Sequence, residues 1–456
     1  MTATYADRIV AAAAAKASPS PRRRKQVQMA VGEVQGLLEK AASKSSPRPR
    51  IEVGGSYAHD TWLQDQTDVD YFLIYPKSVE RSRLGELGME LAEAALARFS
   101  PRKRYAEHPY IEADYGPITV NAVPCYDVAA GEWISAADRS PFHTKYMAAH
   151  LTEQLRSQVR VLKLFLKAQG LYGAEIRVRG FSGYACEVLT LKYGSFIGVL
   201  RGASEWKPGS PLSVEGGEEV AKSLFKNQPF ILLDPVDTSR NLGLAVSPSK
   251  LGELIYVSRA FLGKPNPRYF GSPRMMAPAA MPPYAIDHTL LLAFRYDPKS
   301  EDILWGELRK SAGGIASHLE KEGVEVLRHT VAAEEGTAAM AFLTSAYALP
   351  KARMRDGPEL FRDEATRRFL AASKERGDSW WVGEDLRTHV LVAGEVSSPA
   401  QLLEGFMEDP VKKVGFAKGL ARKAKETYRM RSGARAFSSR RGAEAQALAQ
   451  LVGFRF

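Results

Sequence analysis

The chain has 456 residues, too many for one hydrophobic core, and this length predicts about three domains. Its formal net charge of +11 favours a polyanionic partner, and nucleic acid fits better than a membrane because no basic amphipathic helix or lipidation signal accompanies the charge. The two cysteines exclude a disulfide framework, and the eight scattered histidines make a zinc site with them implausible. We therefore expect a cytoplasmic protein with no membrane partner.

The first 147 residues predict a small α/β unit. Apolar residues at helical spacing predict a helix over 26–42, after the breaker "SPSPRRR", and a second helix is expected over 80–98. The other expected elements are a strand at "IEVGG", a turn and short helix at "SYAHDTWL", a buried strand at "VDYFLIYP", and two strands, "YAEHPYIEADYG" and "PITVNAVPCYDV", around a turn at 114–117.

The rest of the chain predicts a helical region followed by an α+β region. Over 148–262 we expect mostly helices, one over 154–169 and one that begins after Ser182 as its N-cap. Residues 262–283 hold six prolines and two glycines, which is typical of a linker. Over 284–456, the strands "TLLLAFRY", "VEVLRHTVA", "GTAAMAFLTSAYAL" and "RTHVLVAGEV" alternate with helices at 305–321 and 360–376. The fold class is α+β, multidomain.

A pair of aspartates marks the first candidate site. Asp68 and Asp70 stand two residues apart at the start of the buried strand, so both carboxylates project from one face. Such a pair favours Mg²⁺, and a two-metal site is typical of in-line phosphoryl chemistry. Upstream, Gly54 and Gly55 allow backbone N–H groups to approach an anion, and Ser56 offers a hydroxyl. The pattern predicts a nucleoside triphosphate with its metal, although either motif alone is more often a plain turn or strand end.

The joint pattern resembles the DNA polymerase β-like nucleotidyltransferases, in which Gly-Ser precedes an Asp-x-Asp strand. Longer motifs narrow the resemblance to the archaeal, class I CCA-adding enzymes, the tRNA nucleotidyltransferases. These motifs are "GGSYAHDTW", "VPCYDV", "DRSPFHTKY", "LKLFLKAQGLYGAEIRVRGFSGYACE" and "DPVDTSRN", with later similarity at "RDEATRRFL" and "SWWVGEDL". The resemblance implies a nucleotidyltransferase domain with a polymerase β-like palm over 1–147, a helical domain over 148–262 that completes the nucleotide pocket, and a tRNA-binding body and tail over 284–456.

The resemblance also implies an activity and a set of site residues. The activity is metal-dependent transfer of CMP and AMP from CTP and ATP to the 3′ end of tRNA, without a nucleic-acid template. The implied metal-binding and catalytic positions are Asp68, Asp70 and Asn121. The implied nucleotide-binding positions are Gly55, Ser56, His59, His143, Lys163, Tyr172 and Arg240, the last facing the incoming base. Taken singly, each of the last four is more often an ordinary capping, core or surface residue.

The sequence departs from the family pattern at two points. Where the family usually reads G-S-Y-A-R-G, this chain has His59 and Asp60, so a fixed positive charge becomes a titrating one beside an acid. The third metal-binding Asp of the family is here Asn121, which offers a neutral oxygen. Glu112 and Asp127 are the two candidates to supply the missing charge.

A basic segment near the end of the chain predicts an RNA surface. Residues 411–441 hold eleven Lys or Arg against one acid, with Phe416, Tyr428 and Phe437 interleaved for stacking on bases. The candidate RNA-binding residues are Lys412, Lys413, Lys418, Arg422 and Lys423. Three alternatives stay open: a solvated basic face, a tRNA-binding pseudoenzyme weakened at Asn121, and a related RNA nucleotidyltransferase, a polymerase or oligoadenylate synthetase with different product specificity. Whether two chains form a homodimer also stays open.

Overall fold

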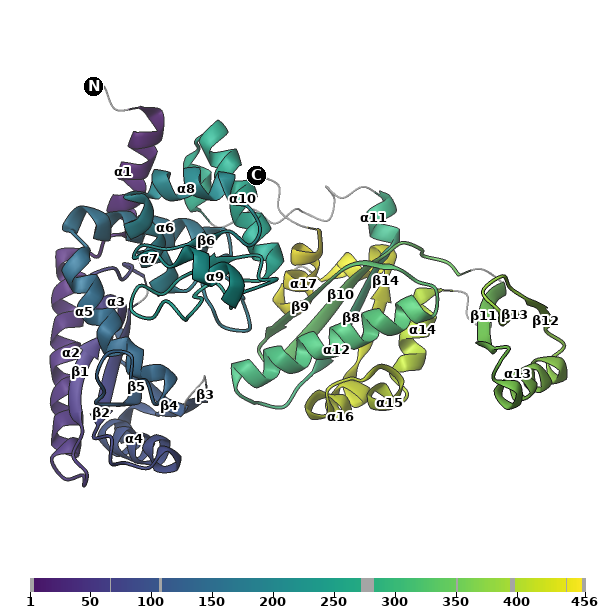
Figure 1. Ribbon diagram of the computed structural model, residues 1–456, viewed down its shortest axis with the longest axis horizontal. Helices are drawn as coiled ribbons and strands as arrows, with labels where there is room; N and C mark the ends of the chain where they lie inside the picture. The colour runs from purple at the N-terminus through teal and green to yellow at the C-terminus, as the bar shows by residue number, and fades with distance from the viewer. Residues whose placement is uncertain are drawn as a thin grey trace. The chain divides into compact units, whose positions relative to one another are not determined.

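The chain divides into two compact units, residues 1–273 and 274–456. The computed structural model describes residues 4–65, 67–105, 109–271, 283–349, 352–393, 398–439 and 441–452. The N-terminal unit contains a five-stranded sheet and a bundle of helices, and the C-terminal unit contains two further sheets (Figure 1). Among the described residues, none of the helices combines the length and the apolar character that crossing a membrane requires.

The sheet of the N-terminal unit has the strand order β1-β2-β5-β4-β3. β2 and β5 run parallel, and the other neighbouring pairs are antiparallel. The strands are β1 (Arg50–Gly54), β2 (Asp68–Tyr75), β3 (Arg102–Tyr105), β4 (Pro109–Tyr115) and β5 (Ile118–Tyr126). The predicted strands and the hairpin of β4 and β5 are confirmed, whereas β3 was not predicted because its sequence, "RKRY", has no apolar alternation.

Helices cover one face of this sheet. Val69, Tyr71 and Leu73 of β2 are fully buried in one core with residues of α2 and α4. The helices that frame the sheet are α2 (Pro21–Ala42), α3 (Gly55–Ala58), α4 (Arg81–Leu96), the 3₁₀ turns η1 (Ala97–Phe99) and η2 (Ala136–Arg139), and α5 (Ser140–His150). α2 begins five residues before the predicted helix, because Ser20 caps it and Pro21 occupies N1, where proline is tolerated.

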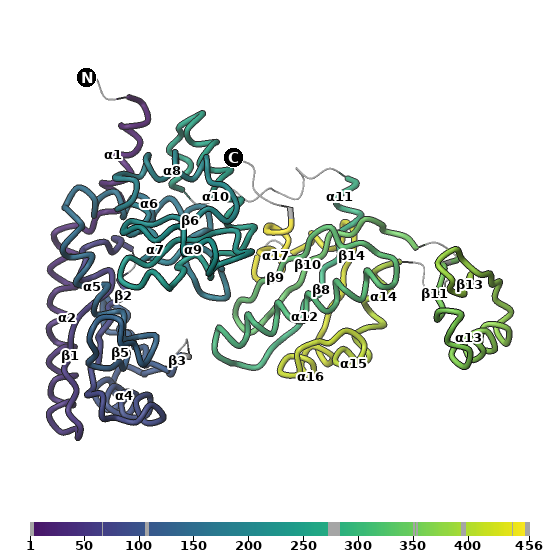
Figure 2. Tube along the Cα trace, in the orientation of Figure 1, coloured from purple at the N-terminus to yellow at the C-terminus, as the bar shows by residue number. Residues whose placement is uncertain are grey.

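A helical bundle forms the rest of the N-terminal unit (Figure 2). Its core contains Phe165, Phe196 and Phe261, whose rings pack edge to face. The bundle comprises α1 (Tyr5–Ala17), α6 (Glu153–Ala168), α7 (Gly183–Tyr193), α8 (Phe196–Glu205), α9 (Glu218–Leu224), α10 (Pro248–Gly263) and η3 (Pro267–Phe270), with the short strands β6 (Pro211–Leu212) and β7 (Ile231–Leu232). The mostly helical character and the Ser182 cap of α7 are confirmed.

The first part of the predicted linker packs against this bundle. Phe270 is 5% exposed, and its carbonyl accepts a hydrogen bond from Lys16 Nζ. Apolar burial therefore overrides the loop tendency of the prolines up to residue 271. The stretch 272–282 lies outside the described residues.

The C-terminal unit contains a four-stranded sheet of order β14-β8-β10-β9 and a three-stranded sheet of order β11-β13-β12. Its strands are β8 (Thr289–Arg295), β9 (Val326–Glu334), β10 (Thr337–Thr344), β11 (Ala352–Glu359), β12 (Ser379–Val382), β13 (Arg387–Ala393) and β14 (Arg429–Ser432). Its helices are α11 (Pro283–Asp287), α12 (Glu301–Lys321), α13 (Asp363–Glu375), α14 (Pro399–Phe406), α15 (Pro410–Val414), α16 (Lys418–Thr427), η5 (Gly433–Ser438) and α17 (Gly442–Val452). The expected α+β pattern is confirmed.

Candidate active site

The two aspartates of β2 lie on the face of the sheet opposite α2 and α4. Because side chains alternate along a strand, the buried Val69 and Tyr71 point toward the helices, and Asp68 and Asp70 point away. The parallel pairing of β2 with β5 sets Asp70 beside Asn121, whose Nδ2 donates a hydrogen bond to Asp70 Oδ1 at 3.0 Å. The structure thus brings Asp70 and Asn121 together, with Asp68 two residues away on the same face.

The Gly-Gly-Ser turn passes directly over Asp70. Gly55 begins α3 with a φ of +62°, and a Cβ atom there would lie 2.0 Å from Asp70 Oδ2. Only glycine fits this approach, both for its backbone conformation and for its lack of a side chain. Ser56 follows in the same turn. The predicted juxtaposition of turn and aspartate pair is therefore present.

The atoms around Asp70 fit a hard cation. Asn121 Oδ1 is buried and has no hydrogen-bond partner among the described residues. Burial raises the pKa of Asp70, although the hydrogen bond from Asn121 and the nearby His59 oppose that rise. No cluster of three or more His, Cys, Asp or Glu in the described parts of the chain could hold a metal. Two carboxylates and an amide oxygen nevertheless match the ligands of Mg²⁺, which also takes phosphate oxygens and water.

The two carboxylates that could compensate for Asn121 are both engaged elsewhere. Glu112 lies opposite Asn121 in β4, but its Oε1 accepts hydrogen bonds from Arg102 and Arg104 at 3.0 and 2.9 Å. Asp127 follows the end of β5, and its Oδ1 lies 3.2 Å from Arg50 Nη2. Either residue would have to leave an ion pair to become a metal ligand.

A buried polar network adjoins the Gly-Gly-Ser turn. Lys163 Nζ lies 3.1 Å from Glu187 Oε1, and His59 Nδ1 lies 2.9 Å from Glu187 Oε2. Thr61 donates its hydroxyl hydrogen to Glu187 and accepts a hydrogen bond from Lys163 Nζ at 2.9 Å. Burial alone would raise the pKa of Glu187, but the charge of Lys163 and the hydrogen bond and charge of His59 outweigh it, and the pKa falls to about 2.

This network changes the picture of two predicted nucleotide contacts. His59 and Lys163 are 3% and 1% exposed, and both are bonded to Glu187 rather than open to solvent. His59 Nε2 is buried and lacks a hydrogen-bond partner within the described ranges. Sequence reasoning missed Thr61 and Glu187, although both stand inside the quoted motifs.

Asp60 holds two helices to the turn. Its φ is +51°, a conformation that an Asp tolerates only with some strain. Arg24 Nη1, from α2, lies 2.6 Å from Asp60 Oδ1. Arg160 Nη1, from α6, donates a hydrogen bond to the Asp60 backbone carbonyl and lies 3.5 Å from Asp60 Oδ2. Asp60 thus pairs with two arginines, whereas His59 pairs with Glu187.

His143 and Arg240 meet at a carboxylate that sequence reasoning missed. His143 Nε2 lies 2.7 Å from Asp234 Oδ2, and Arg240 Nη1 lies 3.3 Å from the same oxygen. The His143 ring stacks on Tyr184 with 4.1 Å between ring centroids. The structure therefore brings these two predicted nucleotide contacts together, from α5 and from the loop after β7.

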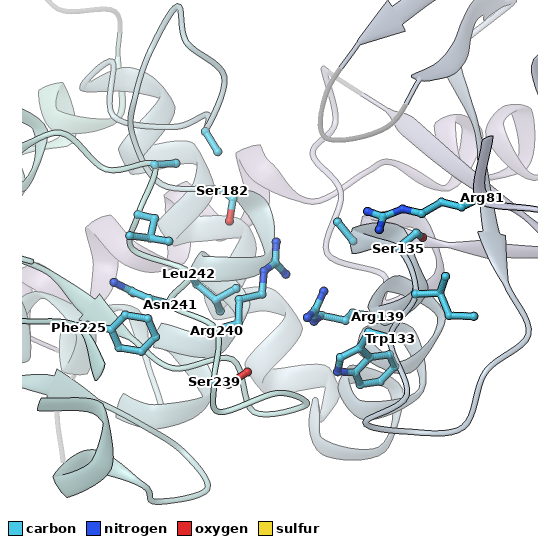
Figure 3. Close-up of a pocket in the computed structure, with 15 residues that line it drawn as sticks. Arg81, Trp133, Ser135, Arg139, Ser182, Phe225, Ser239, Arg240, Asn241 and Leu242 are labelled. Atoms are coloured by element: carbon cyan, nitrogen blue, oxygen red, sulfur yellow. The ribbon is translucent and has the colours of Figure 1, made fainter. Parts of the chain in front are cut away.

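A cavity of about 690 Å³ lies in front of Arg240 (Figure 3). Arg240 and Arg139 reach it from opposite walls, and Ser182 lies at its edge. Arg139 Nε lies 2.7 Å from Asp237 Oδ2, and the guanidinium carbon lies 5.4 Å from the centre of the Trp133 ring. Both contacts hold Arg139 in place. The lining residues are Arg81, Trp133, Ile134, Ser135, Ala136, Arg139, Ala174, Ser182, Phe225, Ser239, Arg240, Asn241, Leu242, Leu244 and Ala245. The volume and the cationic walls suit a nucleotide-sized anion.

Tyr172 and Lys163 lie next to the start of α7, close to this cavity. A Cβ atom on Gly183 would lie 3.1 Å from Tyr172 Oη and 3.6 Å from Lys163 Nζ, and Gly183 follows Ser182 of the cavity wall. Burial raises the pKa of Tyr172 well above its usual value, so its hydroxyl stays protonated at neutral pH. The predicted contacts Lys163, Tyr172 and Arg240 thus lie around one region.

The basic segment of the C-terminal unit is only partly as predicted. Lys412 is 87% exposed, and Arg422 is 73% exposed although it pairs with Asp297 and Glu426. Lys413 pairs with Glu408. Phe416 is 1% exposed in the hydrophobic core, so its predicted stacking on RNA bases is wrong. Its apolar ring is more stable inside the core than at the charged surface.

Family models and curated relatives match most of the chain. The models describe a nucleotidyltransferase domain over residues 34–143, the second domain of tRNA nucleotidyltransferase over 157–271, and the C-terminal domain of CCA-adding enzyme over 288–433. A CCA-adding enzyme of Methanopyrus kandleri is 36% identical over 416 residues, 85% of this chain and 84% of that protein. The chain belongs to the archaeal-type family of CCA-adding enzymes.

A second curated relative and a solved structure are also similar to this chain. The CCA-adding enzyme of Methanocaldococcus jannaschii is 33% identical over 356 residues, 76% of this chain and 79% of that protein. A solved RNA terminal U-transferase aligns with a TM-score of 0.45 and 13% identity, over 58% of this chain and 97% of that chain. The sequence resemblance to CCA-adding enzymes is confirmed by the family models and the curated relatives, and with it the assignment as a nucleotidyltransferase.

Proposed function

We propose that this chain adds C, C and A to the 3′ end of tRNA, from CTP and ATP and without a nucleic-acid template. Family membership over most of its length carries this proposal. The aspartate pair beneath a glycine turn supports it, because that geometry suits a triphosphate with its cation.

Asp68, Asp70 and Asn121 would hold the divalent cation, Mg²⁺ by the chemistry of these ligands, with a second ion shared with the substrate. When bound, such ions polarise the reacting phosphate and the attacking hydroxyl. Asn121 supports the site in two ways, because its Nδ2 orients Asp70 and its Oδ1 has no other partner among the described residues.

The residues of the turn and the cavity would position the reactants. The N–H groups of Gly55 and Ser56 and the Ser56 hydroxyl suit the triphosphate, while His143, Tyr172 and Arg240 suit the nucleoside. The RNA 3′-hydroxyl releases its proton to water as its oxygen bonds to the α-phosphorus, the bond from that phosphorus to the bridging oxygen breaks, and pyrophosphate leaves. Lys163 and His59 stay predicted nucleotide contacts, and each must either act from a distance or exchange its bond to Glu187 for one to phosphate.

The tRNA would lie along the basic segment, through Lys412, Lys413, Lys418, Arg422 and Lys423. The division into domains 1–147, 148–262 and 284–456, the cytoplasmic location and the homodimer stay predictions.

One observation favours a second candidate, a catalytically impaired tRNA-binding protein. Asn121 supplies no charge, and Glu112 is engaged by two arginines, so the cation site has one anionic ligand fewer than the family pattern. Membership of the family favours the active enzyme over this alternative and over an RNA nucleotidyltransferase with a different product.

The test is nucleotide addition to a tRNA that lacks its terminal CCA. The purified chain is incubated with Mg²⁺ and labelled CTP and ATP, and the product is sized and sequenced. We expect addition of CCA and then arrest. A bound but unextended tRNA under all divalent cations would support the impaired protein, and a longer or different tail would support the related polymerase.

A further inference from the structure

Asp234 is a buried carboxylate that joins three parts of the N-terminal unit. It is fully buried and lies in the loop after β7. Its Oδ2 accepts from His143 Nε2 at 2.7 Å and from Arg240 Nη1 at 3.3 Å. Its Oδ1 accepts from the Val236 N–H at 3.0 Å and from the Tyr184 hydroxyl at 3.4 Å. Groups from α5, α7 and the loop after β7 therefore converge on one side chain.

The surroundings keep this carboxylate ionised. Burial alone would raise the pKa of Asp234, but the hydrogen bond and charge of His143, with Arg240 behind them, lower it below its usual value. A charged acceptor with four donors fixes their directions more strongly than a neutral one would.

The geometry leaves most of the Arg240 guanidinium free for a ligand. Asp234 engages Nη1, the side chain is 38% exposed, and the residue lines the cavity of Figure 3. His143 donates from Nε2 and stacks on Tyr184, so its orientation too is set by groups around Asp234. One carboxylate thus fixes two side chains that are proposed to contact the nucleotide.

Cytosine and adenine share the edge that a fixed donor can recognise. Each presents a ring nitrogen acceptor, N3 or N1, beside an exocyclic amino group, whereas uracil and guanine present a ring N–H beside a carbonyl. A guanidinium N–H held in one place can donate to the ring nitrogen of C or A and faces another donor in U or G. A guanidinium that swings can instead reach the carbonyl oxygen of U or G.

We propose that Asp234 is the positioning residue for base selection, because it holds Arg240 where its donors accept C and A and exclude U and G. This inference rests on the proposed function, in which Arg240 faces the incoming base. Asp234 itself touches no substrate and acts through Arg240, with His143 held in the same arrangement.

The test compares Asp234→Asn with the wild type in single-turnover addition to tRNA lacking CCA, with CTP, ATP, UTP and GTP supplied separately. The variant keeps the shape of the side chain and loses its charge. We expect the preference for CTP over UTP, as a ratio of the single-turnover rate constant divided by the nucleotide Kd, to fall on the order of 10- to 100-fold, the size of one charged hydrogen bond.

Glu444→Gln is the matched control. Glu444 is also a buried carboxylate, 6% exposed, and it accepts hydrogen bonds from Arg429, Arg431 and Ser439 of the C-terminal unit, where it lines no part of the cavity. We expect this control variant to leave the preference for CTP over UTP unchanged. A fall in all four rates with an unchanged ratio in Asp234→Asn would overturn the proposal, since only a structural role would remain.

Arg240→Lys keeps the test decisive if Asp234→Asn fails to fold. Lysine retains the positive charge but lacks the planar guanidinium, so we expect the same loss of preference for CTP over UTP. An unchanged preference in Arg240→Lys would overturn the proposal. A wild type that adds no nucleotide would refute the proposed function, whereas CCA addition with unaltered ratios in both variants would refute only this inference.

Discussion

The two units of the molecule use their charged side chains in different ways. In the N-terminal unit, Lys163 and Glu187 are 1% and 2% exposed and bonded to each other. In the C-terminal unit, Lys412 and Arg422 are 87% and 73% exposed, and the carboxylates that they pair with are exposed as well. The first arrangement fixes atoms in place, and the second presents charge to solvent.

The difference separates chemistry from binding. Buried charges have few orientations and strong mutual interactions, which suits a reaction that needs groups in set positions. Exposed charges are screened by salt and gain affinity by releasing counterions from a polyanion. Substitutions in the N-terminal unit should therefore change rate or stability, and those in the basic segment should change the salt dependence of tRNA binding.

The largest effect is expected at the aspartate pair. Asp70→Ala or Asp68→Ala should lower CMP addition on the order of 1,000-fold or more, because each removes a carboxylate of the proposed cation site. The affinity for tRNA should stay close to that of the wild type. Asp114→Ala, at the exposed end of β4, is the control. Normal turnover in both strand variants would refute the assignment of the cation site.

Breaking the Glu187 network should destabilise the N-terminal unit. Glu187→Gln leaves Lys163 buried without its counter-charge. The free energy of unfolding, measured by urea denaturation, should therefore fall by about 3–5 kcal/mol. The exposed pair of Glu219 with Lys222 offers the control Glu219→Gln, expected to change stability by less than about 1 kcal/mol.

The same network gives the wild type an acid-sensitive stability. Because the folded-state pKa of Glu187 is about 2, below its unfolded value of about 4.3, its contribution is present above pH ~4.3 and is lost as pH falls toward 2. Glu187→Gln should lack this part of the pH dependence. Equal acid sensitivity in both proteins would contradict the pairing.

Placing a carboxylate at Asn121, the proposed third metal position, should make the stability of the protein depend on the metal. Without divalent cations, Asn121→Asp should melt at a lower temperature than the wild type, because it replaces a donor to Asp70 with a like charge. Mg²⁺ should raise its melting temperature more than that of the wild type. Single-turnover CMP addition should rise on the order of 100-fold if no other carboxylate compensates.

Asn121→Ala removes both the donor and the oxygen of the amide, so it is the control for the response to Mg²⁺. It should lower stability without gaining a response to Mg²⁺. If Asn121→Asp responds to Mg²⁺ no more than the wild type does, Asn121 does not contact the cation.

The smallest effect is expected in the basic segment. Replacing Lys412, Lys418 and Lys423 by Gln should reduce the slope of log affinity for tRNA against log salt by about one for each phosphate that is no longer neutralised. The control replaces the three exposed lysines Lys207, Lys222 and Lys226 of the N-terminal unit, with the same change in net charge. Equal slopes in both triple variants would mean that the segment is a solvated face.

Much of the fold follows from local sequence patterns. The apolar run of β2, the Ser182 cap of α7 and the glycine turn before β2 all depend on a few neighbouring residues, so the sequence predicts them. Asp234 and Glu187 escaped prediction because their partners are distant: His143 is 91 residues from Asp234, and His59 is 128 residues from Glu187. Which charged residues form such pairs depends on which of them become buried in the fold, and the composition of the chain does not show this. The same reason explains the error at Phe416.

The parallel pairing of β2 with β5 has a consequence for the order of folding. Asp70 and Asn121 are 51 residues apart in the chain, with α4, β3 and β4 between them. A pairing of that separation costs loop-closure entropy and forms more slowly than a helix. During refolding from denaturant, α2 and the other helices should therefore form before Asp70 and Asn121, the proposed ligands of the cation, come together. Nucleotide addition should recover only in the slowest refolding phase, after most of the helical circular dichroism signal has returned.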